Sequence, residues 1–473
     1  MKNKKTLFAT IWSVVDNFST QFLGFIIGIV LARLLSPSDY GTVGVLVIFI
    51  GIANVFVDCG FAIGLIRKKE RTDEDLATAF YFNVIVGVIT YLILFFISPW
   101  VAAFFKMPIL VVLLRVLALC LIFNSLSIVQ NAILTAALKT KVQARVNIST
   151  QFIMGCVGIY LAFKGYGVWT LVIQQVGSSI LKCVFLWITV KWLPNKKWSK
   201  NSFMYLFGFG WKLLGANLIG TFFNQIHSFF IGRALGASEL GLYTKANDLS
   251  SKPNDTLLNV VNRIALPILS SVNDNITQIK NAYSKMIRLG AFVSFPLFAL
   301  LILIAKPLII IMWTDKWLEC VNLFQLLCIS ASFGIISQLG LTIMQLMNRT
   351  DLTLKFEFYK KPVTLILLIL AMPFGLFYIT LSAVVASIYC CLVNMYATKM
   401  LITYTYKEQF KDFSPYLLIS MIACAIGYIP TLFFTSNYLL LVVSSLFFIG
   451  TYLLIAYLFR VQGMRELLSL IKK

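Results

Sequence analysis

The stretch IVLARLLSPSDYG at residues 29–41 returns 200 positions later as FFIGRALGASELG at residues 229–241. Both copies stand where an apolar run ends in a short loop. The residues that recur at this offset are Asn17 and Asn217, Arg33 and Arg233, Leu35 and Leu235, Ser38 and Ser238, and Gly41 and Gly241. A repeat of this kind in a hydrophobic chain is typical of transporters assembled from two related halves.

The composition is that of a membrane protein. Of the 473 residues, 59% are hydrophobic and only 12% are charged, and the mean hydropathy is +0.88. Apolar runs of about 20 residues, the length that crosses a bilayer, recur along the whole chain. The nine cysteines show no metal-ligand spacing, so neither a metal nor another cofactor is expected. We therefore predict an all-α polytopic membrane protein with about fourteen spans, at residues 10–32, 42–66, 77–99, 110–136, 146–163, 168–190, 203–231, 242–268, 286–305, 321–347, 357–374, 376–398, 415–434 and 438–459.

The formal net charge of +22 reports topology rather than nucleic-acid binding. Most of the Lys and Arg residues fall in alternate loops between the predicted spans. The loops of the other side carry only Arg33, Lys106, Lys164, Arg233, Lys306 and Lys316. By the positive-inside rule this bias places both termini in the cytoplasm. The excess cations would also attract the anionic head groups of membrane lipids.

The repeat divides the chain into parts. Six predicted spans separate the two copies, and an even number gives both halves the same orientation in the membrane. The loops RTDEDLATAFY at residues 71–81 and NDNITQIKNAY at residues 273–283 also correspond, and each is predicted to start a helix. We expect an N-terminal lobe at 1–200, a C-terminal lobe at 201–412 and a two-helix appendix at 413–473.

Four segments carry a resemblance to a known family: ARLLSPSDYG at 32–41, VFVDCGFAIGLIRKKERTDED at 55–75, IGRALGASELGLYTKANDLSSKP at 231–253 and LPILSSVND at 266–274. In these segments the chain resembles the multidrug/oligosaccharidyl-lipid/polysaccharide exporters, and among them the Wzx-type polysaccharide flippases. The resemblance implies two six-helix lobes around a central cavity. It also implies alternating-access transport of an undecaprenyl-diphosphate-linked oligosaccharide across the bacterial inner membrane, with H⁺ or Na⁺ as counter-ion. A polysaccharide polymerase and a chain-length regulator would be the protein partners.

The predicted span at 242–268 has an unusually polar face. Its members recur at spacings of three and four residues, which places them on one side of a helix: Lys245, Asp248, Lys252, Asp255, Asn259 and Asn262. From first to last this polar stripe extends about 26 Å, close to the thickness of the hydrocarbon core. Such a face cannot point at lipid, so we expect it to line a hydrated cavity that holds diphosphate and sugar. The alternative is a structural stripe whose opposite charges pair along the helix.

Other ionisable residues at membrane depth are further candidates, because each costs free energy to insert. We expect Asp16 in the first span, Lys212 in the seventh and Arg115 in the fourth to face the substrate, although Arg115 could instead reach toward the interface. Asp58 is a candidate for ion coupling or for pairing with a cation. Arg33 and Arg233 would act as a gate or as interfacial anchors. Mid-span Lys182 has no assigned role. His227, the single histidine, is better explained as a hydrogen-bonded bundle residue than as a proton relay.

Several functions compete for this pattern. A flippase for a lipid-linked oligosaccharide fits best, and the absence of a GxxxxGK[ST] phosphate loop from the sequence argues against a nucleotide-driven pump. A lipid II flippase or a drug/cation exporter of the same superfamily is the alternative. A membrane-embedded glycan polymerase or ligase would need a larger extramembrane loop with clustered catalytic residues. A pure scaffold would not need so many buried charges.

Overall fold

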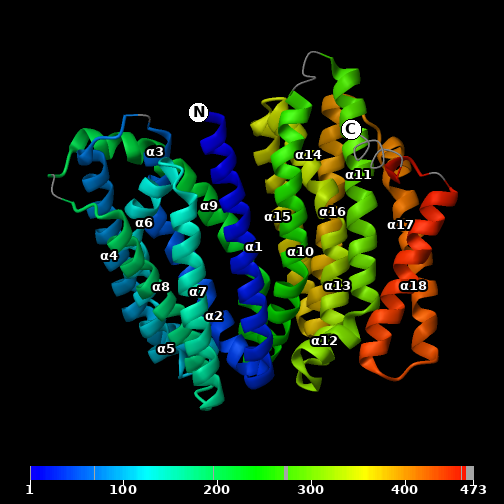
Figure 1. The fold of residues 1–473 in the computed structure, drawn as a ribbon, viewed down its shortest axis with the longest axis horizontal. Coiled ribbons are helices and arrows are strands. Elements are labelled where there is room, and N and C mark those ends of the chain that lie inside the picture. The colour runs from blue at the N-terminus through cyan, green and yellow to red at the C-terminus, as the bar shows by residue number, and fades with distance from the viewer. Residues whose placement is uncertain (1, 69, 195–196, 271–274, 460, 465–473) are drawn as a thin grey trace. The chain divides into compact units, whose positions relative to one another are not determined.

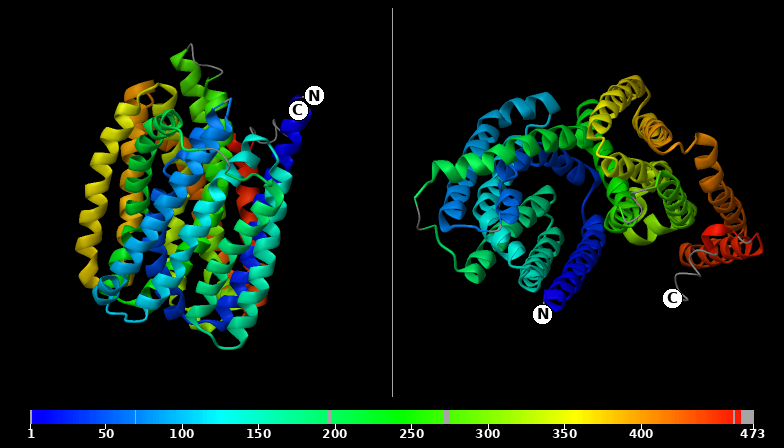
Figure 2. Two further views of the ribbon diagram at one scale, coloured as in Figure 1. Left: turned by 90° about the vertical axis from the view of Figure 1, so that its left-hand side faces the viewer. Right: turned by 90° about the horizontal axis from the view of Figure 1, so that it is seen from above.

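The computed structural model describes residues 2–68, 70–194, 197–270, 275–459 and 461–464, and helices account for nearly all of these residues (Figure 1). No strand occurs in the part of the chain that is described. The helices form two compact units, Met1–Gly241 and Leu242–Lys473. Within each unit the helices run side by side along one direction (Figure 2).

The first unit contains α1 (Lys2–Leu34), α2 (Pro37–Asp58), α3 (Phe61–Arg67), α4 (Asp73–Phe105), α5 (Leu110–Leu117), α6 (Leu119–Ala136), α7 (Thr140–Phe163), α8 (Val168–Val190) and α9 (Lys200–Ala234). It also includes the first turn of α10 (Ala237–Ser270), most of which belongs to the second unit. The other helices of the second unit are α11 (Ile276–Leu303), α12 (Ala305–Trp313), α13 (Cys320–Ser332), α14 (Gly334–Leu346), α15 (Thr350–Ala371), α16 (Leu376–Ile402), α17 (Tyr406–Tyr428) and α18 (Asn437–Leu458).

The boundary between the units follows α9. This helix packs on α2, α3 and α4, so the first unit extends to Gly241 rather than ending near residue 200. The predicted division into two lobes and an appendix follows the sequence repeat rather than the contacts between helices. It therefore remains a prediction.

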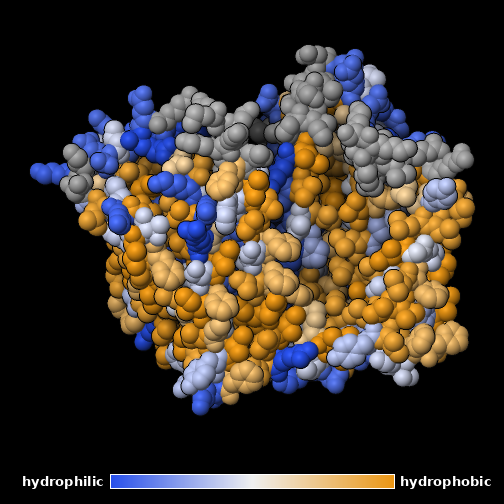
Figure 3. All heavy atoms as spheres, viewed as in Figure 1, coloured by the Kyte–Doolittle hydropathy of each residue, from blue (hydrophilic) through white to orange (hydrophobic). Residues whose placement is uncertain are grey.

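The predicted class, an all-α polytopic membrane protein, is confirmed. In the described residues, 11 segments are long and apolar enough to cross a membrane, and a twelfth, α9, qualifies if its two bent parts count as one span. Two further long helices, α10 and α15, carry too many polar residues to be recognised by hydropathy. The exact count of fourteen therefore remains a prediction. On the face drawn in Figure 3, hydrophobic side chains dominate at mid-height and hydrophilic ones gather toward the two ends.

Short sequence signals start the helices. Ser36 caps α2 in a reciprocal box with Asp39, whose carboxylate accepts from the Ser36 N–H at 2.9 Å. Thr72 and Asp75 form the same box at the start of α4, and Lys68 binds Asp75 at 2.7 Å. The side chain of Asn275 caps α11. Both loops predicted to start helices therefore do so.

The two copies of the repeat meet backbone to backbone inside the first unit. A Cβ atom on Gly41 would lie 1.6 Å from the carbonyl oxygen of Ala237, and one on Gly241 would lie 1.8 Å from that of Pro37. Real Cβ atoms do not approach so closely, so only glycine permits the first turns of α2 and α10 to cross here. This explains why the repeat keeps glycine at both positions.

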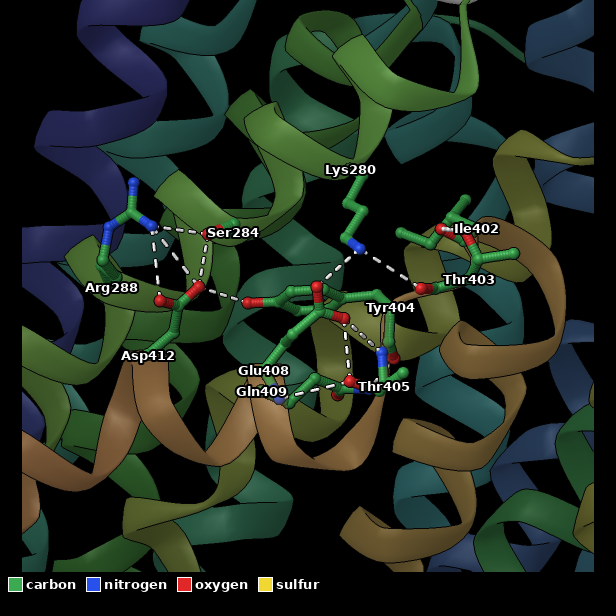
Figure 4. A network of polar contacts seen from close by, with 10 residues as sticks. All are labelled: Lys280, Ser284, Arg288, Ile402, Thr403, Tyr404, Thr405, Glu408, Gln409 and Asp412. Carbon is green, nitrogen blue, oxygen red and sulfur yellow. Dashed lines mark hydrogen bonds and ion pairs between the residues drawn. The ribbon is translucent and has the colours of Figure 1, made fainter.

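Within the second unit, a polar network connects α17 to α11 (Figure 4). Lys280 of α11 pairs with Glu408 of α17 at 2.7 Å, and Arg288 lies 3.4 Å from Asp412. Asp412 also accepts hydrogen bonds from Ser284 and Tyr404. Burial and the carboxylate of Asp412 both raise the pKa of the Tyr404 phenol, so this donor keeps its proton. The network joins the start of α17 to α11 at the end of the predicted C-terminal lobe.

The crossing of the repeat copies can be tested by adding one methyl group. Gly41→Ala and Gly241→Ala should each lower the melting temperature of the purified protein by roughly 5 °C or more, since overpacking costs about 1–3 kcal/mol or more. Gly28→Ala is the matched control, because nothing lies within 4 Å of the Cβ position on this helical glycine. Equal melting temperatures for all three variants would show that the two helices do not touch.

Candidate functional site

The polar stripe of α10 lies on one helix as predicted, but its members differ in exposure. Lys245 is only 7% exposed, whereas Asp248, Lys252, Asp255 and Asn259 are all exposed in the structure. Along most of its length the stripe is therefore not packed into the second unit.

Lys245 is held at the start of the stripe. Its ammonium lies 5.4 Å from the ring centroid of Trp313, the last residue of α12, and this cation–π contact offsets part of the cost of burial. Asp248 is attracted by both Lys245 and Lys252. This attraction fits the interpretation in which opposite charges pair along the helix. The exposed Asp255 and Asn259 fit the alternative of an open polar face, so the structure supports each interpretation for one part of the stripe.

Beside the stripe, α10 borders a polar pocket of about 340 Å³ in the second unit. Its walls come from α10, α13, α14 and α16, and its polar lining is Asn247, Ser250, Ser251, Asn254, Ser330, Ser337, Gln338 and Ser387. Next to it lies a buried ionic group that the sequence analysis did not identify, although Lys360 falls within the predicted span at 357–374. Lys360 is 4% exposed on α15, lies 2.5 Å from Glu357 and donates to Asn394 at 3.3 Å.

The first unit contains a larger polar pocket of about 510 Å³, which we call the asparagine pocket. It lies between α2, α6 and α9, and its polar lining consists of Asn54, Asp58, Asn124, Asn217, Thr221 and Asn224. Asn124 donates to Asn54 at 3.1 Å. Asn124, Asn217, Thr221 and Asn224 stand near the middle of long segments, whereas Asn54 and Asp58 lie toward the C-terminal end of α2. Of the predicted candidates, only Asp58 lines it.

Asp58 stands at a break in its span. The next two residues, Cys59 and Gly60, have φ values of 44° and 71°, which end α2 and start α3 in a new direction. Gly210 of α9 packs against this break, where a Cβ atom would lie 2.3 Å from the carbonyl oxygen of Cys59. The break thus presents the Asp58 side chain, which is half-buried, to the pocket.

Asp16 belongs to a separate polar group in the first unit. Its carboxylate accepts a hydrogen bond from Asn147 of α7 at 3.0 Å and attracts Lys182 of α8. The sequence analysis named Asp16 and Lys182 but missed Asn147, which lies 131 residues away in the chain. The group joins α1, α7 and α8, so it has a structural use whether or not substrate reaches it.

Arg115 donates a hydrogen bond to α4 where Pro99 interrupts its backbone hydrogen bonding. Pro99 has no N–H, which leaves the carbonyl oxygen of Phe95 in α4 without its usual helical donor. The Ser98 hydroxyl donates to this oxygen at 2.7 Å, and Arg115 adds a longer bond to it at 3.3 Å. Arg115 also donates to the Ser98 oxygen at 3.0 Å, and its guanidinium lies 4.2 Å from the Phe95 ring. These contacts favour a structural role over the predicted place in a substrate cavity.

The remaining candidates are spread over the first unit. Arg33 is exposed in the last turn of α1, and Arg233, in the last turn of α9, stacks 4.9 Å from the Phe104 ring. Cations are favourable at both helix ends, which fits anchoring as well as gating. Lys212 lies on α9, and its side chain is outside the described part of the structure. Half-buried His227 also lies on α9.

Known proteins with a similar fold are membrane transporters. The structure of the lipid II flippase MurJ in an inward closed conformation superposes with a TM-score of 0.75, covering 97% of this chain and 100% of that one at 16% identity. The lipopolysaccharide biosynthesis protein WzxC of Escherichia coli is 22% identical over 76% of this chain and 73% of its own. The succinoglycan biosynthesis transport protein ExoT of Rhizobium meliloti is 23% identical over 69% and 67%.

The fold is that of a multi-pass membrane protein, and it matches the fold of a solved lipid II flippase. Within this class, the chain belongs to the polysaccharide biosynthesis protein family, whose family model matches residues 30–322. The predicted relationship to polysaccharide flippases is thereby confirmed.

The role of Arg115 can be separated from substrate binding by a double-mutant cycle. Arg115→Met should destabilise the purified protein by about 1–3 kcal/mol, because it removes the bonds to Ser98 and Phe95 and leaves the Ser98 hydroxyl as the single side-chain donor to the Phe95 carbonyl among the described residues. In a Pro99→Ala background the restored N–H reaches that oxygen, so the same substitution should cost at least about 0.5 kcal/mol less. Melting temperatures of the four proteins in detergent give the coupling. An equal cost in both backgrounds would contradict the structural role.

Proposed function

We propose that this protein is a flippase that moves a polyprenyl-diphosphate-linked oligosaccharide repeat unit from one leaflet to the other. The head group of such a lipid carries two phosphates and several sugars. Its passage through a bilayer therefore requires a polar route at membrane depth, whereas the polyprenyl tail can stay in lipid.

The observation that carries this proposal is the polar face of α10. It extends over a distance close to the membrane thickness, most of it is exposed, and it combines two lysines with two carboxylates and two carboxamides. Lysine ammonium groups bind phosphate as point charges. Carboxamides and carboxylates bind sugar hydroxyls. One helix thus offers partners for both parts of the head group.

A drug or cation exporter is less well supported. Lipophilic cations are held by aromatic rings and carboxylates. Neither polar pocket meets this need, since serines, asparagines and glutamine dominate their polar linings. Lipid II shares the diphosphate and the lipid tail with a repeat unit, so the two substrates differ only in the sugar part.

Transport would follow alternating access, with H⁺ or Na⁺ moving as counter-ion because the sequence has no nucleotide-binding loop. We place the protein in the bacterial inner membrane with both termini in the cytoplasm. A polymerase would then receive the repeat units at the outer surface, and a chain-length regulator would act with it.

Complementation of cells that lack the gene tests the stripe together with Lys212 of α9. Lys212→Ala, Lys245→Ala, Lys252→Ala and Asp255→Ala should lower surface polysaccharide at least about tenfold where they remove a charge-assisted contact to the head group. Protein level in the membrane is measured in parallel, and lipid-linked repeat units should accumulate. Lys285→Ala is the control, because Lys285 is an exposed lysine on α11 outside the site. Normal polysaccharide from all four variants would make the stripe structural.

Topology is tested by labelling single cysteines in a variant whose nine native cysteines are replaced. Lys164→Cys should react with a membrane-impermeant maleimide in intact spheroplasts, whereas Lys197→Cys should react only after the membrane is opened. Both lysines are exposed in the structure. The reverse labelling pattern would place the termini outside.

A further inference from the structure

We propose that the asparagine pocket of the first unit is a sugar-binding subsite, which takes an uncharged ring of the transported glycan. This inference rests on the proposed function and deepens it, because it assigns the sugar part of the substrate to particular residues. Several polar side chains of this pocket form no hydrogen bond or ion pair with described residues that would stabilise the fold.

Three side chains of the pocket lack partners inside the protein. Asn54 and Asn124 bind each other at 3.1 Å, so this pair is explained by holding α2 against α6. Asp58, Asn217 and Asn224, by contrast, form no side-chain hydrogen bond or ion pair with any described residue. Polar groups within membrane helices are costly unless water or a ligand binds them. These three are therefore available to a ligand.

The chemistry of the lining selects the ligand. Each carboxamide offers two N–H donors and an accepting oxygen, and a carboxylate accepts from two neighbouring hydroxyl groups. A sugar ring presents hydroxyls that both donate and accept. Among the described side chains that line the pocket there is neither a cation nor an aromatic ring, so these residues suit neither the diphosphate nor a lipophilic cation.

The size of the pocket argues against a coupling ion at Asp58. A dehydrated cation needs oxygen ligands closed tightly around it, whereas a space of about 510 Å³ would hold many water molecules of roughly 30 Å³ each. The same volume lies in the range of pockets that take small organic ligands. The sequence prediction that Asp58 couples an ion is therefore replaced, in this proposal, by a contact with sugar.

The second unit has a pocket at the corresponding position of the repeat, but none of the described residues that line this pocket corresponds to Asp58 in charge. At the repeat offset, Asn254 stands where the first half has Asn54, but Leu258 stands where it has Asp58. Asn254 and Leu258 both line the second pocket, which is smaller, about 340 Å³. Gly334 of α14 lies beside Asn254 there, with the Asn254 oxygen 2.6 Å from the place of a Cβ atom. The repeat thus kept the position of the pocket, and only the first half has the carboxylate.

The test compares two lipids that differ only in their sugars. Lipid-linked repeat units are extracted from cells that lack the gene, and polyprenyl diphosphate without sugar serves as the second probe. Binding of each to the purified full-length protein is measured by native mass spectrometry. Asn217→Ala and Asn224→Ala should each weaken binding of the glycosylated lipid at least about threefold, and together about tenfold. Binding of the bare diphosphate lipid should not change.

Asp58→Asn, which keeps shape and removes charge, should act like the asparagine variants. Asn201→Ala is the matched control, since Asn201 is exposed at the start of the same helix and lies outside the pocket. Unchanged binding of the glycosylated lipid by the pocket variants, or an equal loss for both lipids, would overturn the sugar subsite alone. A change only in the ion dependence of transport would also overturn it, in favour of a cation site. If the wild-type protein binds neither lipid, the proposed function fails as well.

Discussion

The close contact between the first turns of α2 and α10 is the constraint on which the arrangement of the repeat depends. Gly41 and Gly241 have no side chains, so the two helix backbones can touch. Gly41 packs against the carbonyl of Ala237, and Gly241 packs against the carbonyl of Pro37. The helices that follow the two copies of the repeat, α2 and α10, thus start in contact with each other. Thirteen residues beyond the glycine, each of these helices carries an asparagine, Asn54 in one and Asn254 in the other, which lines a polar pocket of its own unit. The sequence repeat therefore coincides with two recurring structural features, the close glycine contact and the asparagine that lines a pocket.

Polar groups inside the membrane helices fall into two kinds. Some hold the fold: Asp16 joins α1 to α7 through Asn147, and Arg115 supplies the donor that Pro99 cannot. Others, such as Asp58 and the exposed Asp255 and Asn259 of α10, form no side-chain hydrogen bond or ion pair with the described residues. Sorting charges by what they bind, rather than by depth alone, separates residues that build the transporter from residues that remain for its substrate.

Apolar runs predicted the helices well because hydrophobicity is a local property. The run at 168–190 coincides with α8, and the run at 110–136 coincides with α5 and α6 together. What failed were features that depend on distant partners or on backbone turns. Asn147 gave no local signal for its bond to Asp16. The break after Asp58 needs positive φ at Cys59, a residue that rarely adopts it. A signal for Arg115 did exist, since Pro99 stands four residues after Phe95 and leaves the Phe95 carbonyl without its helical N–H donor. The sequence does not indicate that Arg115 is a side chain that donates to this carbonyl.

The prevalence of uncharged polar side chains in the asparagine pocket bears on how such a protein diversifies. Relatives in this family carry names that refer to different polymers, among them lipopolysaccharide and succinoglycan. A diphosphate and a polyprenyl chain are common to lipid-linked repeat units, so the charged surface that meets them has little freedom to vary. Exchanges among Asn, Gln, Ser and Thr at the pocket keep volume and polarity nearly constant while they reposition donors and acceptors. The scaffold can thus acquire a new cargo through one neutral side chain at a time, without a cost to insertion in the membrane.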